Sequence, residues 1–359
     1  MFAGGGVARG RYHAAVPGLY PDVPVFHTEQ LPVGDGHVMQ VQHGGSPGGI
    51  PVLLLHGGPG SGQSPLLRRA FDPARFHLIA PDQRGAGGST PAGDTAHNTL
   101  AHLLADLRLL REHLGLERWL VVGGSWGATL ALAHAADAPH AVSGLLLRAS
   151  FLARPADIDG FFDPAGRPLP AHWAALALAA GEDQPSAMAA ALHQVLEHGA
   201  PPRQAQAALA WAAWEQALAG TAVDHASVAA DATRQAPVAA AVIGHPGAPG
   251  QADPAALIQR YRVQASYLAH ACWMTPSLLH RASLAPPVPT LLLHADDDAI
   301  CAPQGARALQ AALPQAQLRW AVGAGHNPAH PAMAALQRCA LDHWARHACW
   351  PAADDWPRA

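Results

Sequence analysis

The chain has 359 residues, of which 50% are hydrophobic and 13% are charged, and this balance excludes a disordered protein. The formal net charge is −4 and no block of basic residues occurs, so nothing in the composition indicates nucleic-acid binding. A chain of this length can bury a large core, either as one domain with an insertion or as two domains.

No targeting or membrane signal stands out. The first 18 residues lack the continuous apolar core of a secretory signal, and no stretch reaches the roughly 18 uninterrupted apolar residues of a membrane span. The four cysteines, at positions 272, 301, 339 and 349, show no zinc-binding spacing. We therefore expect a cytoplasmic protein that binds neither a membrane nor nucleic acid.

The first third of the chain alternates between strand and helix patterns. Residues 37–43 alternate in polarity, and residues 51–55 and 76–80 are short apolar runs typical of buried strands. Residues 100–114 carry leucines on one side and charges on the other, which predicts an amphipathic helix.

A Gly-x-Ser-x-Gly box follows at residues 123–127, with Ser125 at its centre. It lies between an apolar run at 120–122 and an Ala/Leu-rich helical stretch, the strand–turn–helix layout of a nucleophile elbow. Such a turn exposes the serine hydroxyl and directs the helix N-terminus at it. Glycine is abundant here, 35 of 359 residues, so the flanking strand and helix carry this interpretation rather than the box itself.

The pattern changes after a further strand at 142–148. Residues 171–234 are rich in Ala, Trp and Gln with helical spacing, residues 236–254 form a Pro/Gly-rich loop, and residues 255–272 are helical again. We interpret residues 150–285 as a helical cap domain.

Strands resume at 290–294 and 317–322, after prolines that include Pro286. Strands that alternate with helices predict an α/β fold with a mostly parallel sheet, flanked by helices. We assign residues 1–149 and 286–359 to this core, into which the cap is inserted.

A serine hydroxyl needs a base to become a nucleophile, and a carboxylate to orient that base. In this fold class the acid and then the histidine follow the serine, each on a loop after a strand. Among 23 histidines, His326 lies in a Gly-rich loop directly after a strand, so we choose it as the base.

The acid comes from Asp296, Asp297 or Asp298, which follow the strand at 290–294. At least two of the three are expected to form a solvated acidic turn. A metal site is disfavoured, because three adjacent carboxylates do not all face one point. We choose Asp298, the deepest in the loop.

The oxyanion formed on the attacked carbonyl needs N–H donors already in place. One is expected from the backbone of Trp126. The other is expected from Gly57 or Gly58 in the HGGPG segment after an early strand, although that segment read alone could be a simple turn.

With these pieces placed, the sequence resembles the proline iminopeptidases (prolyl aminopeptidases), serine peptidases of the α/β-hydrolase fold. The resemblance runs from about residue 19 to residue 344. It rests on five motifs in order: HGGPG (56–60), DQRGAGGSTP (82–91), GGSWGATLAL (123–132), LLLRASFLARPADID (145–159) and WAAWE (211–215). The loop of the acid departs from the family's HGRYD, so its register rests on the preceding strand and on Cys301.

The resemblance implies cleavage of N-terminal proline, with the substrate ammonium held by carboxylates of the cap. An α-amino group has a pKa of about 8 and is mostly cationic at neutral pH, so such acids select a free N-terminus. The first acid corresponds to Glu215, which could otherwise be an ordinary exposed helix residue. Arg148 corresponds to a site arginine, or to a structural charge at a strand end. The second acid is replaced by Gln264, so we expect weaker binding of prolyl peptides or a shifted substrate.

The sequence thus predicts a serine aminopeptidase that releases N-terminal proline from small peptides through an acyl-enzyme, without a metal or organic cofactor. An alternative is an α/β-hydrolase that acts on other small amides or esters because its cap specificity is relaxed. A third interpretation is a catalytically silent ligand-binding protein, against which the complete set of triad residues argues.

Overall fold

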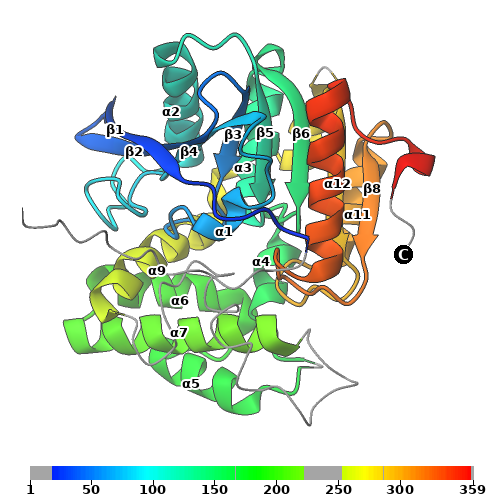
Figure 1. The fold of residues 1–359 in the computed structure, drawn as a ribbon. Coiled ribbons are helices and arrows are strands. Elements are labelled where there is room, and N and C mark those ends of the chain that lie inside the picture. The colour runs from blue at the N-terminus through cyan, green and yellow to red at the C-terminus, as the bar shows by residue number, and fades with distance from the viewer. Residues whose placement is uncertain (1–17, 166, 222–252, 286, 357–359) are drawn as a thin grey trace, which may run out of the picture.

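The computed structural model describes residues 18–165, 167–221, 253–285 and 287–356. Its centre is one eight-stranded sheet with the order β1-β2-β4-β3-β5-β6-β7-β8 (Figure 1). β2 pairs antiparallel with β1 and β4. The remaining strands, in the sheet order β4-β3-β5-β6-β7-β8, are mutually parallel. The strands are β1 (Val25–Gly34), β2 (His37–Gly45), β3 (Ile50–Leu55), β4 (Phe76–Pro81), β5 (Trp119–Gly124), β6 (Val142–Arg148), β7 (Thr290–Ala295) and β8 (Gln317–Ala321).

The central strands are apolar on both faces because helices cover both faces. In β3, Leu53 and Leu55 belong to the core shared with α2, α3 and α11, whereas Val52 and Leu54 belong to the core shared with α12. Alternate residues of a strand point to opposite faces, so a strand buried on both sides is a continuous apolar run. This is why the sequence shows such runs at β3, β5, β6 and β7.

The helices outside the sheet are of two kinds, those that flank it and those inserted between β6 and β7. The flanking helices are α1 (Pro65–Arg68), α2 (Leu100–His113), α3 (Trp126–Asp137), α11 (Pro303–Ala312) and α12 (Pro331–His347). The inserted helices are α4 (Pro155–Phe161), α5 (Pro170–Ala180), α6 (Pro185–His198), α7 (Pro201–Thr221), α9 (Pro254–Ala269) and α10 (Leu278–Leu284). Short 3₁₀ turns are η1 (Pro139–Ala141), η2 (Ala271–Trp273) and η3 (Ala353–Asp355).

The inserted helices α5, α6, α7 and α9 pack on one another below the sheet in Figure 1, at the end toward which the parallel strands point. Their shared core includes Trp211 of α7 and Tyr261 of α9, stacked with ring centroids 5.0 Å apart. α9 also contacts the α/β core, because Tyr267 packs edge-on against Trp126 of α3 at 4.9 Å and its hydroxyl donates to Asn98 Oδ1, just before α2. One side of the inserted helices therefore faces the loops at the carboxyl ends of the strands.

The predicted α/β class with a mostly parallel sheet is confirmed. Each predicted strand is present within about two residues, and the predicted helices at 100–114 and 255–272 correspond to α2 and α9. The strand β1 was not predicted. The end of the predicted loop at 236–254 is instead the start of α9, while residues 222–252 and Pro286 lie outside the described residues.

The assignment of residues 150–285 to a separate domain stays a prediction. No helix in the described parts of the chain is both long enough and apolar enough to cross a membrane.

Candidate active site

Ser125 lies in the turn between β5 and α3, with φ 56° and ψ −124°. A non-glycine residue in this region carries strain of about 1–3 kcal/mol, so the surrounding structure must impose it. The Ser125 N–H donates to the Arg148 carbonyl at 2.9 Å, and a Cβ on Gly127 would collide with the Leu55 carbonyl oxygen. The turn is therefore fixed by the neighbouring strands β3 and β6, as expected for an elbow that holds its serine out of the backbone.

His326 and Asp298 form a buried pair on the loops after β8 and β7. His326 Nδ1 lies 2.9 Å from Asp298 Oδ2 and 3.1 Å from Oδ1. The Oδ1 atom also accepts backbone N–H groups of Ile300 and Cys301 at 2.9 and 2.8 Å. Burial acts to raise the pKa of the Asp298 carboxyl, but the charge and hydrogen bond of His326 outweigh it and hold this pKa below its usual value. The carboxylate thus stays ionised and fixes the tautomer and orientation of the imidazole.

The two acids before Asp298 form an exposed turn, as predicted. Asp296 Oδ1 accepts the N–H of Gly323 at 2.9 Å and Asp297 Oδ1 accepts the N–H of Gly325 at 2.8 Å. Three consecutive carboxylates therefore bind three points of the loop that carries His326.

The Ser125 hydroxyl lies 3.7 Å from the thiol of Cys301, whose pKa is raised by burial and by Asp298. Within the described residues no hydrogen bond joins Ser125 to His326, although both line one pocket. A nucleophile–base hydrogen bond is often long in the unliganded enzyme and tightens when substrate binds. Sequence reasoning used Cys301 only as a register marker and missed its position beside the serine.

The HGGPG segment passes directly beside Ser125. A Cβ on Gly57 would lie 3.3 Å from the Ser125 Cβ, and both Gly57 and Gly58 line the pocket. Trp126 is the first residue of α3, so its backbone N–H is one of those without an intrahelical partner. The expected oxyanion donors are therefore gathered on two sides of the serine.

One buried glutamine that sequence reasoning did not single out connects these two sides. The Trp126 indole donates to Gln83 Oε1 at 2.8 Å, and Gln83 Nε2 donates to the His56 carbonyl at 3.1 Å. The backbone N–H of Gln83 also donates to His56 Nε2 at 3.0 Å, and burial lowers the pKa of that imidazole. The only signal in the sequence was its place in the DQRG motif, directly after β4.

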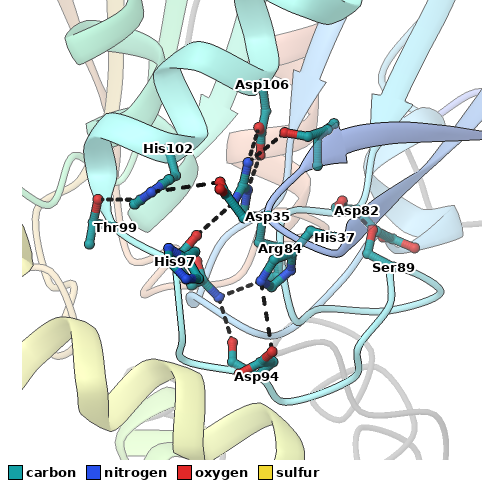
Figure 2. A network of polar contacts seen from close by, with 12 residues as sticks. Asp35, His37, Asp82, Arg84, Ser89, Asp94, His97, Thr99, His102 and Asp106 are labelled. Atoms are coloured by element: carbon teal, nitrogen blue, oxygen red, sulfur yellow. Dashed lines mark hydrogen bonds and ion pairs between the residues drawn. The ribbon is translucent and has the colours of Figure 1, made fainter.

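Arg84, the next residue of the DQRG motif, anchors the loop after β4 through ion pairs on the side away from the pocket (Figure 2). Arg84 binds both carboxylate oxygens of Asp106 at 2.7 and 2.8 Å, and its Nη1 lies 3.2 Å from Asp35. Among the described residues, Asp35 with His97 and His102 is the one group that could hold a metal, since their ligand atoms lie within 4.8 Å of one another. None of these residues lines the pocket, and Asp35 is already paired with Arg84.

The inserted helices contribute a second polar cluster to the pocket. Glu215 of α7, which is 4% exposed, accepts hydrogen bonds from Gln264 Nε2 at 2.7 Å, from the Tyr261 hydroxyl at 2.9 Å and from Arg260 Nη2 at 2.9 Å. Glu215 and Gln264 thus lie together as expected, and the reading of Glu215 as an ordinary exposed residue is wrong. Arg260, one helical turn before Gln264, was not predicted, because nothing local in the sequence indicates its partner 45 residues away.

Arg148, at the end of β6, is buried and lines the same pocket. Its Nη1 donates to the His326 carbonyl at 3.5 Å. Burial lowers the pKa of the guanidinium, while Asp298 opposes that shift. The arginine therefore lies at the end of β6 and binds the loop of the histidine, which fits both a site arginine and a structural charge at a strand end.

Comparison with known proteins identifies the family of the chain. Residues 50–331 match the family model described as the alpha/beta hydrolase fold. A proline iminopeptidase of Xanthomonas citri is 35% identical over 314 residues, which cover 87% of this chain and 95% of that protein. One of Neisseria meningitidis serogroup A is 34% identical over 318 residues, with 87% and 94% covered.

The chain belongs to the proline iminopeptidase family. It is accordingly a serine hydrolase of the α/β-hydrolase fold. Among solved structures, VinJ superposes with a TM-score of 0.62 at 18% identity, and a proline iminopeptidase-related protein of Thermus thermophilus with 0.52 at 23%. These alignments cover 89% of this chain and 98% and 97% of the two structures, and at such identities they bear on the fold alone.

Proposed function

We propose that this member of the proline iminopeptidase family releases N-terminal proline from small peptides through an acyl-enzyme formed on Ser125. The observation that carries the proposal is the common pocket. It brings together a serine in a strained elbow, a buried imidazole–carboxylate pair and a buried acid on the inserted helices. The proposed specificity for proline comes from the bacterial relatives, which are named proline iminopeptidases.

In this proposal His326 accepts the Ser125 proton as the hydroxyl attacks the carbonyl carbon of the scissile bond. Asp298 keeps Nδ1–H directed at itself, which leaves Nε2 free to act as the base. The backbone N–H groups of Trp126 and of Gly57 or Gly58 stabilise the oxyanion. His326 then gives the proton to the leaving amine, and water attacks the acyl-enzyme with the same imidazole as base.

Glu215, Gln264 and Arg148 are assigned to substrate binding. Glu215 and Gln264 lie across the HGGPG loop from the serine, where the nitrogen next to the attacked carbonyl belongs. Arg148 supports the carbonyl of His326 and contributes positive charge to the floor of the pocket.

A panel of 4-nitroanilides tests this function: prolyl, alanyl and N-acetylprolyl. We expect the prolyl amide to be hydrolysed with the highest kcat/KM and the blocked amide to be inert. Ser125→Ala should lower kcat by a factor on the order of 10⁵–10⁶. Ser143→Ala, a change on the same sheet at the amino end of β6, is the matched control and should keep wild-type activity. Equal rates for the prolyl and alanyl amides would refute the proline assignment.

One observation favours the alternative of a hydrolase that acts on other small amides or esters. The acid expected to attract the substrate ammonium is already paired with Arg260 at 2.9 Å, and the second acid is replaced by Gln264. The same panel decides between the two functions. Failure of a fluorophosphonate to label Ser125 would instead support a silent ligand-binding protein.

A further inference from the structure

The charge of the pocket that contains Ser125 differs from the negative charge that the family motifs predict for binding an ammonium group. Its described lining contains one acid, Glu215, and two arginines, Arg148 and Arg260. A subsite that selects a cationic N-terminus by attraction needs unbalanced negative charge. The described part of the lining has more positive than negative side chains.

Arg260 is held firmly in this position. Its Nη2 donates to Glu215 Oε2 at 2.9 Å, and its guanidinium carbon lies 4.9 Å from the centre of the Tyr261 ring. The two ionic side chains are 8% and 5% exposed, so water screens their interaction little. Glu215 also accepts from Tyr261 and Gln264, so both of its oxygens are engaged within the protein.

The cluster lies next to the reacting centre. A Cβ on Gly58 would be 3.5 Å from Gln264 Oε1 and 3.7 Å from Arg260 Nη2, whereas a Cβ on the preceding Gly57 would be 3.3 Å from the Ser125 Cβ. Two successive residues of one loop thus separate the nucleophile from the cluster. The nitrogen of an N-terminal residue is bonded to the carbon next to the attacked carbonyl, so it falls within reach of the cluster.

Gln264 has one unused group, and it is an acceptor. Its Nε2 is committed to Glu215 at 2.7 Å, which fixes the orientation of the amide because a carboxylate cannot donate to an amide oxygen. Its Oε1 is buried and has no hydrogen-bond partner among the described residues, although the side chain is only 7% exposed. A buried acceptor of this kind is costly unless a ligand N–H binds it.

We propose that Arg260 determines the specificity of this pocket: it neutralises Glu215, so that the pocket selects an acyl residue whose N–H nitrogen is uncharged when it binds. Gln264 Oε1 accepts that N–H. The inference rests on the proposed peptidase function and names the substrate form that it uses, the free amine rather than the ammonium. Among the described residues, the charged or titratable groups around Arg260 are Glu215 and Tyr261 within the cluster, and Arg148 of β6 with His56 and His326 of the strand-end loops in the rest of the pocket.

Substrates that differ in amine basicity test the inference at one pH. Prolyl, 4-fluoroprolyl and 4,4-difluoroprolyl 4-nitroanilides have nearly the same shape, but each fluorine withdraws electrons and lowers the pKa of the amine. At pH 6 every enzyme group has the same protonation state for all three substrates. For the wild type we expect kcat/KM to rise along the series, by roughly tenfold for each unit by which the amine pKa falls.

Arg260→Met removes the cation but keeps most of its apolar stem. It leaves Glu215 as an unbalanced anion, so we expect the order of the three substrates to flatten or reverse and kcat/KM for the prolyl amide at pH 6 to rise at least about tenfold. Arg262→Met is the matched control: it removes the same charge from the same helix at a side chain that binds the Leu196 carbonyl outside the pocket. This control should keep the wild-type order.

A second variant covers the case in which Arg260→Met does not fold. Arg260→Met combined with Glu215→Gln removes both charges, leaves the cluster neutral and should keep the wild-type order. A falling or flat order in the wild type would overturn the inference while the hydrolysis of the prolyl amide upheld the proposed function. Hydrolysis of the alanyl amide with no turnover of any of the three prolyl amides would overturn both.

Discussion

The two halves of the pocket are built in different ways. The loops at the strand ends place Ser125, His326 and Asp298 through backbone constraints: a strained φ, a glycine that cannot carry a side chain, and carboxylates that accept backbone N–H groups. The inserted helices place Glu215 and Arg260 through side-chain contacts between two helices, an ion pair and the hydrogen bonds of Tyr261 and Gln264 to Glu215. The comparison teaches that, in the proposed mechanism, the groups that attack the carbonyl are positioned by their own loops, whereas the groups proposed to choose the substrate are positioned by contacts between distant side chains.

The largest effect is expected when the aspartates of one strand-end loop are replaced one at a time, which tests whether this loop positions the catalytic groups. Asp298→Asn keeps the shape but offers His326 an amide, which permits the wrong tautomer, so we expect kcat to fall by a factor on the order of 10⁴. Asp297→Asn removes a carboxylate that binds only the Gly325 backbone and should cost less than about tenfold. Steady-state kinetics of both variants decide the matter, and equal losses would mean that the acid has been assigned to the wrong position.

A smaller effect is expected at Gln83, the side chain that connects Trp126 to His56. Gln83→Leu removes both side-chain hydrogen bonds, so the two segments that carry the proposed oxyanion donors lose their common support. We expect kcat to fall by a factor on the order of 10² with little change in KM, because misplaced donors affect the transition state more than the ground state.

The neighbouring Gln63→Leu is the control for this change. Gln63 donates to the carbonyls of Leu54 and Pro81, whereas the Trp126 indole donates to Gln83. It should lower thermal stability without lowering kcat. If the two variants lost activity to the same degree, Gln83 would have only a structural role.

The smallest effect concerns the framework behind the elbow. Burial, with Arg111 and Arg108 nearby, lowers the pKa of His134 in α3 to about 4. Between these two pKa values the unfolded chain binds a proton at His134 that the folded chain does not bind. The free energy of unfolding is therefore unaffected by this histidine above its ordinary pKa of 6.5, and it decreases as the pH falls toward 4. The loss is about 3 kcal/mol.

Urea unfolding between pH 4 and 7 measures this dependence. His134→Gln keeps an acceptor for the Trp119 indole but cannot titrate, so its free energy of unfolding should vary less with pH. The exposed His172→Gln, whose imidazole is not among the groups that shift the pKa of His134, should leave the wild-type slope unchanged. A wild-type slope in the first variant would place the acid sensitivity elsewhere, for example in the inserted helices.

The fold and the catalytic loops could be predicted because their signals are contiguous in sequence. Apolar runs indicated β3 to β8, and the glycines around Ser125 indicated the elbow. β1 was missed because it is an edge strand with mostly exposed residues and an internal Pro32, so it lacks the apolar alternation of a buried strand. The pairing with β2 stabilises it instead.

The cluster on the inserted helices was only half predictable. Glu215 and Gln264 were placed through the family motifs, and both line the pocket. Arg260 has no motif of its own, and its effect depends on α7 and α9 lying side by side, which a linear pattern does not contain. The same holds for Cys301, whose thiol lies near the serine only because β7 and β5 both lie close to β6 in the sheet.

The three consecutive aspartates after β7 have a consequence for engineering. Asp296, Asp297 and Asp298 all bind the loop after β8, so each of the two loops stabilises the other. Replacing only one of these two loops with the corresponding loop of a relative would leave hydrogen-bonding groups of the other loop without partners. Chimaeras of this enzyme should therefore exchange residues 295–303 and 321–328 together, because the two segments form one structural unit although they are separate in the sequence.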